Sequence, residues 1–113
     1  MVHSLYIAAA GSVSLDIRDD AKITAIVIAA NDQAPGGAEV SFTSTAQLTT
    51  NDTTGVLAGL PLAGSLAPAT MMYVMNEPVE AGERLYLHVT GANACRAFVY
   101  TDRAGARPST RRR

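Results

Sequence analysis

The sequence predicts an all-β protein, a single-domain antiparallel β-sandwich of about eight short strands that we expect to form a jelly roll. Short segments in which apolar and polar residues alternate recur along the chain, separated by turns rich in Gly, Pro, Asn and Asp. No segment has a persuasive helical period. The 113 residues, 48% of them hydrophobic, suit one domain with its own core. Another two-sheet sandwich topology is the near alternative.

Four strands are expected in the first half of the chain. "HSLYIAA" and "VSLDI" are short, and the three apolar residues of the second share one face. "ITAIVIAA", residues 23–30, is nearly continuous in β-branched and other apolar residues, which is typical of a central strand covered on both sides. After the turn "NDQAPGG", the segment "AEVSFTSTAQL" alternates and places Ser41, Thr43 and Thr45 on an outward face.

The second half begins with the segment that is hardest to interpret. "VLAGLPLAGSLAPAT", residues 56–70, contains Gly and Pro and is read as an irregular excursion with room for one short strand. "MMYVM", "RLYLHVT" and "CRAFVYT" follow as strands. Alternation turns one set of their side chains inward: Leu85, Leu87, Val89, Cys95, Ala97 and Val99. It turns the other set outward: Tyr86, His88, Arg96, Phe98 and Tyr100.

The charges divide the chain into an acidic body and a short basic tail. Residues 1–102 hold four basic and ten acidic residues, a net charge of −6, whereas residues 103–113 hold five arginines. The tail has no apolar period, and we expect it to be disordered unless a partner orders it. Such an asymmetry indicates an interaction arm. No aromatic residues are interleaved with these arginines, so the tail does not favour nucleic acid as a partner.

No motif in the sequence indicates catalysis, and we expect neither a metal nor a cofactor. Asp16, Asp19 and Asp20 are close together, but their spacing differs from a known calcium loop and fits a solvated turn better. His88 is read as a surface or interface histidine rather than as a zinc ligand. Cys95, the only cysteine, lies on an inward face, where it behaves as a small hydrophobic residue. No run approaches the ~20 apolar residues of a membrane span.

The order of these features resembles small jelly-roll virion proteins of tailed bacteriophages. The resemblance runs over residues 7–101, from "DAKITAIVIAAND" and "AEVSFTSTAQL" to "VEAGERLYLHVTGANACRAFVYT". It is closest to head decoration (cement) and head-fibre proteins, and similar stretches occur in jelly rolls of the tumour-necrosis-factor and complement-C1q type. Its hallmark residues are Val79, Ala81, Gly82, Glu83, Leu85, Leu87 and Val89.

The resemblance implies a structural virion protein that is made in the host cytoplasm and decorates the capsid surface. Its partners would be the major capsid protein and two further copies of the chain in a homotrimer. Neither a membrane nor nucleic acid is expected as a partner. The alternative is a receptor- or carbohydrate-binding module of a head or tail fibre, which would carry aromatic residues on exposed loops. The candidate contact residues are Leu5, Ile7, Ser41, Thr43, Thr45, Arg103, Arg107, Arg111, Arg112 and Arg113.

Overall fold

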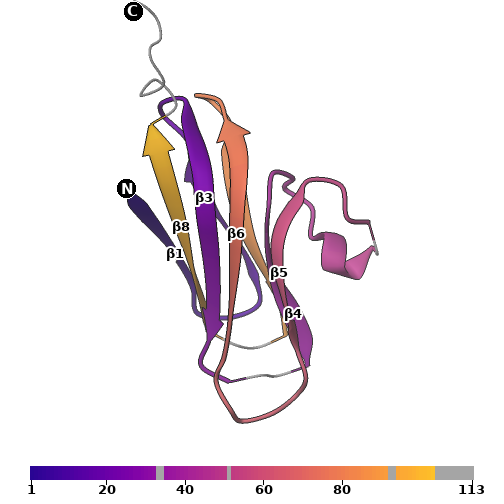
Figure 1. The fold of residues 1–113 in the computed structure, drawn as a ribbon. Helices are drawn as coiled ribbons and strands as arrows, with labels where there is room; N and C mark the ends of the chain where they lie inside the picture. Colours follow the sequence, from indigo (N-terminus) through magenta and orange to yellow (C-terminus); the bar gives the residue numbers. More distant parts are fainter. Residues whose placement is uncertain (33–34, 51, 92–93, 104–113) are drawn as a thin grey trace, which may run out of the picture.

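The chain folds into two four-stranded antiparallel sheets that pack face to face (Figure 1). The computed structural model describes residues 1–32, 35–50, 52–91 and 94–103. One sheet has the order β1-β8-β3-β6 and the other β2-β7-β4-β5. The strands are β1 (Val2–Ile7), β2 (Gly11–Asp16), β3 (Ala21–Ala30), β4 (Gly36–Ser41), β5 (Val56–Leu62), β6 (Ala69–Val79), β7 (Arg84–Thr90) and β8 (Cys95–Arg103).

The pairing confirms the predicted jelly roll. β1 pairs with β8, β2 with β7, β3 with β6 and β4 with β5, all antiparallel. The first half of the chain therefore pairs with the second half in reverse order, like one long hairpin wound into two sheets. This doubling of the sheet is how a jelly roll limits its exposed edges.

The core lies between the sheets and follows the predicted alternation. Ile26 and Ile28 on β3 and Leu85 and Leu87 on β7 are fully buried. The inward-facing residues predicted on β7 and β8 all lie in this core. Since side chains alternate along a strand, the same register turns the intervening residues to the outer faces.

A β-bulge in β3 explains one departure from strict alternation. Ile23 and Ile26 both face the core although they are three positions apart. The register against β8 shifts between Ile23 and Ala25, which leaves Thr24 as the extra residue relative to β8. Against β6 the shift is opposite, and the extra residue lies on β6 between Val74 and Glu77. The Thr24 hydroxyl donates to the Tyr100 carbonyl oxygen at 3.3 Å. An extra residue of this kind bends the strand without breaking the ladder on either side.

Two expectations about individual elements are wrong, and a third is confirmed. β4 ends at Ser41, and the following residues leave the sheet toward a 3₁₀ turn at Gln47–Thr49. The excursion contains one strand, β5, as the sequence allowed. Pro61 is tolerated there because β5 is an edge strand, which has a side with no ladder for the missing N–H to join. Finally, β3 is central in its sheet, but only its inner face is covered by the other sheet.

Candidate interaction surfaces

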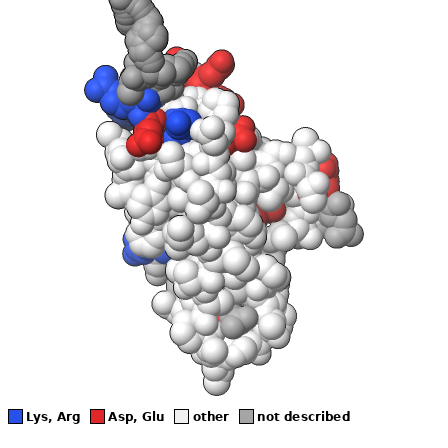
Figure 2. Space-filling view, in the orientation of Figure 1, with Lys and Arg blue, Asp and Glu red and all other residues white. Residues whose placement is uncertain are grey.

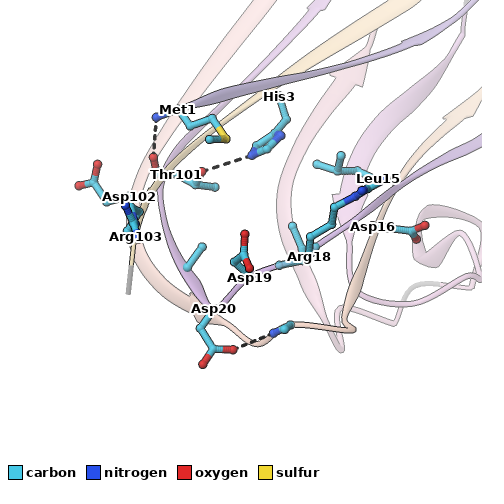
Figure 3. A pocket seen from close by; sticks show the side chains of 13 residues that line it. Met1, His3, Leu15, Asp16, Arg18, Asp19, Asp20, Thr101, Asp102 and Arg103 are labelled. Carbon is cyan, nitrogen blue, oxygen red and sulfur yellow. Dashed lines mark hydrogen bonds between the residues drawn. The ribbon is translucent and has the colours of Figure 1, made fainter. Parts of the chain in front are cut away.

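A hollow of about 1190 Å³ lies at the end of the sandwich where the charged residues gather (Figures 2 and 3). It is lined by the start of β1, the β2–β3 turn and the end of β8. The Met1 amino group donates to the Thr101 carbonyl oxygen at 2.8 Å, and the Thr101 hydroxyl lies 3.3 Å from His3 Nε2. These contacts join the N-terminus to β8 across the rim of the hollow.

The aspartates at the end of β2 and in the β2–β3 turn do not converge on one point (Figure 3). Asp16 pairs with Arg84, with both side chains largely exposed. Asp20 instead accepts the Ala81 N–H at 2.9 Å, which ties the β2–β3 turn to the β6–β7 turn. Among the residues that the structure describes, no group of three His, Cys, Asp or Glu side chains is placed to hold a metal ion.

His88 is buried, contrary to the prediction of a surface histidine. The residue is 1% exposed because residues 42–50, hereafter the covering segment, fold over the outer face of the β2-β7-β4-β5 sheet. Nε2 donates to the Thr43 carbonyl oxygen at 2.9 Å, so in the neutral ring Nδ1 accepts the Ser12 hydroxyl at 2.6 Å. Glu39, opposite His88 in the ladder, accepts the Gln47 N–H at 2.6 Å. These two side chains hold the covering segment on its sheet.

Cys95 is 2% exposed, which confirms the predicted inward position. Burial raises the pKa of its thiol from 9.0 to about 11. A thiolate is the reactive form, so this cysteine is poorly suited to act as a nucleophile.

We predict that Cys95 is inert in the folded protein. At pH 8 a thiol reagent should modify it only at the rate of unfolding, and fast labelling of native protein would contradict its burial. Because its folded pKa lies above the unfolded value, this thiol destabilises the fold as the pH rises from about 9 to about 11. Comparison with Cys95→Ala by urea titration across that range isolates this contribution.

The outer side of the β1-β8-β3-β6 sheet, hereafter the open face, is largely apolar and has no covering segment among the described residues. Met72 is 61% and Val74 78% exposed there. Figure 2 shows mostly uncharged side chains over these strands, with most of the charges gathered at one end and a separate basic group at the left margin. The open face consists of Val2, Ser4 and Tyr6 on β1, Arg96, Phe98 and Tyr100 on β8, Ala25, Val27 and Ala29 on β3, and Thr70, Met72 and Val74 on β6.

Arg96 is the one charged member of the open face, and its charge is already engaged within the sheet. The guanidinium carbon lies 4.9 Å from the centroid of the Tyr6 ring. Its Nη1 donates to the Ser4 hydroxyl at 2.9 Å. A cation placed over an aromatic ring is partly satisfied by it. Arg96 therefore already has interaction partners within its own sheet and does not require an acidic residue from a binding partner.

The structure separates the candidate contact residues predicted from the sequence. Leu5 and Ile7 are buried in the core, so their strand offers a partner its alternate residues Ser4 and Tyr6 instead. Ser41 is also buried and its hydroxyl donates to the Thr43 carbonyl oxygen at 3.2 Å, which removes the predicted polar strand face. In the covering segment Thr43 is half-buried and Thr45 exposed.

Arg103 ends β8 beside the charged hollow. The other tail arginines, Arg107, Arg111, Arg112 and Arg113, lie outside the described residues.

Sequence reasoning missed the open face because it assumed that β3 was covered on both sides. The signal was present in the exposed positions of "MMYVM", whose outward residues are Met72 and Val74. The exposed aromatic residues Tyr6 and Tyr100 lie on strands of this face and not on loops. That placement does not favour the carbohydrate-binding alternative.

Comparison with protein-family models, with curated proteins and with solved structures finds no match for this chain. The described residues contain no helix long and apolar enough to cross a membrane.

Proposed function

We propose that this protein is a structural virion protein that binds the outside of a phage head and stabilises the shell without catalysis. The observation that carries the proposal is the open face, a broad apolar surface on a β-sandwich. Contiguous apolar patches of several hundred Å² on a soluble protein mark binding sites for other proteins. The resemblance to phage decoration proteins suggests the capsid as the setting. The partners are then the major capsid protein and further copies of the chain.

Binding alone is sufficient for this function. A protein that binds the assembled shell but not its dissociated subunits stabilises the shell by mass action, by about 2.7 kcal/mol per site when its free concentration is 100 times Kd. The basic tail, with Arg103 at its start, is a proposed second contact. Its five arginines would suit an acidic surface, including the body of a neighbouring copy with its net charge of −6.

The test is co-sedimentation of the purified protein with mature and with immature shells of a matching phage. We expect saturable binding at a fixed copy number per capsid hexamer, with preference for the mature shell. Sedimentation without shells controls for aggregation, and removal of residues 104–113 tests the tail contact. Absence of binding to either shell would refute the decoration role.

A further inference from the structure

We infer that the open face pairs with the open face of a second copy of this chain. The inference deepens the proposed function, on which it rests for the assignment of this face to protein binding. It assigns the open face to self-pairing, which leaves the contact with the shell to other surfaces such as the basic tail, and it fixes how the two sheets lie. In the proposed pair a twofold axis runs parallel to the strands, between β8 and β3, and β1 of each copy lies over β6 of the other.

The two sheets differ in a way that leaves only one face in need of a partner. On the β2-β7-β4-β5 sheet, the chain's own segment after β4 covers the outer side and is held by Glu39 and His88. No described segment does the same for the β1-β8-β3-β6 sheet. Val74 and Met72 are consequently as exposed as loop residues although they lie within a strand.

The chemistry of the open face selects an apolar and nearly uncharged partner. A strongly charged surface placed against Val74, Met72 and Tyr100 would lose water without gaining ion pairs. The open face of a second copy is itself apolar and nearly uncharged, so it meets this requirement. The rotation brings Arg96 of the two copies to the same level at one end of the contact, where each guanidinium is already engaged by Tyr6 and Ser4 of its own chain.

Large and small side chains alternate between the strands of the open face in a way that makes its shape self-complementary. Phe98 and Tyr100 form an aromatic ridge along β8, whereas the neighbouring positions on β3 carry Ala25, Val27 and Ala29. A second ridge follows on β6 at Met72 and Val74. Rotation about an axis between β8 and β3 places the aromatic ridge of each copy over the small residues of the other. The same contact is thus made twice, as an isologous interface requires.

The area agrees with a stable but modest dimer. The exposed side chains of the open face offer on the order of 600 Å², against about 800 Å² per partner in an interface of standard size. Twofold pairing predicts a dimer, or an assembly that contains twofold axes. It therefore departs from the trimer that the resemblance implies, and the mass of the protein in solution distinguishes the two.

Cysteine cross-linking tests the geometry directly. Ser4 and Met72 lie in one cross-strand row on the two edge strands of the sheet, three inter-strand spacings or about 14 Å apart within one chain. In the proposed pair, Ser4 of each copy lies over Met72 of the other. Cys95 is buried and adds no background thiol. A bifunctional maleimide shorter than the intrachain separation should link Ser4→Cys/Met72→Cys into a covalent dimer.

The single variants make the cross-linking decisive. Neither Ser4→Cys nor Met72→Cys alone should give a covalent dimer, whereas a mixture of the two should. A dimer formed by either single variant would overturn the proposed axis, and the absence of dimer in the double variant and the mixture would overturn the pairing.

A charge on the open face tests the interface without a reagent. Val74→Asp should raise the dissociation constant of the dimer about 100-fold or more in sedimentation equilibrium, because the carboxylate would be buried opposite β1 of the partner. Leu66→Asp is the matched control, since Leu66 is 93% exposed on the β5–β6 loop and lies off the face. Equal effects of the two variants, or a wild type that is monomeric or trimeric, would overturn the inference. If the protein is monomeric but binds shells, the inference is wrong and the proposed function is not affected. If it forms the dimer but does not bind shells, only the proposed function is refuted.

Discussion

Gly36→Ala should be the most destabilising conservative substitution in this protein, lowering the free energy of unfolding by about 3–5 kcal/mol. Gly36 begins β4 with φ +143°, a conformation that residues with a Cβ rarely adopt. A Cβ at this position would lie 2.3 Å from the Thr90 carbonyl oxygen on β7. Because that atom belongs to the backbone of a paired strand, it cannot move without displacing the sheet. Thermal unfolding should show a decrease in Tm of about 10–20 °C.

Gly59→Ala is the matched control for this prediction. Gly59 lies on the neighbouring strand β5, and a Cβ there would meet only the Ala38 carbonyl oxygen at an ordinary 3.9 Å. We expect a change in Tm of no more than a few degrees. If both variants unfold at nearly the same temperature, the close approach of β4 to β7 at Gly36 is wrong.

Ile26→Ala should lower the free energy of unfolding by about 2–5 kcal/mol, measured by urea titration. Ile26 is fully buried at the centre of the β1-β8-β3-β6 sheet, directly after the bulge in β3. Truncation removes its contacts with the opposite sheet and leaves a cavity between two paired layers. Such layers cannot close around the cavity without breaking their ladders, so the cost should fall in the upper part of the range.

Leu66→Ala provides the comparison for Ile26→Ala, because the two substitutions remove the same number of carbon atoms. Leu66 is 93% exposed, and its truncation should change the free energy of unfolding by less than about 0.5 kcal/mol. A cost at Ile26 as small as that at Leu66 would mean that β3 does not cross the core in this register.

The fold could be predicted from local patterns because alternation is imposed by the backbone itself. Each strand needs apolar residues on the side that faces the core. The inward orientation of Leu85, Leu87 and Val99 can therefore be predicted from their own strands alone. The positions at which strands end are harder to predict from the sequence. Ser41 and Thr43 continue the alternation of β4, yet the chain leaves the sheet between them because Glu39 and His88 hold the covering segment in place.

The candidate site depended on information that no single segment contains. Alternation and charge pattern were sufficient to predict an all-β chain, its division into an acidic body and a basic tail, and the inward set of core residues. Which outer face is covered depends on how the chain packs in three dimensions. The apolar residues of the open face come from four strands that are distant in sequence, and each contributes only three positions to it. In any one strand such residues look like ordinary surface or core positions, and they become a surface only when antiparallel pairing aligns them in rows.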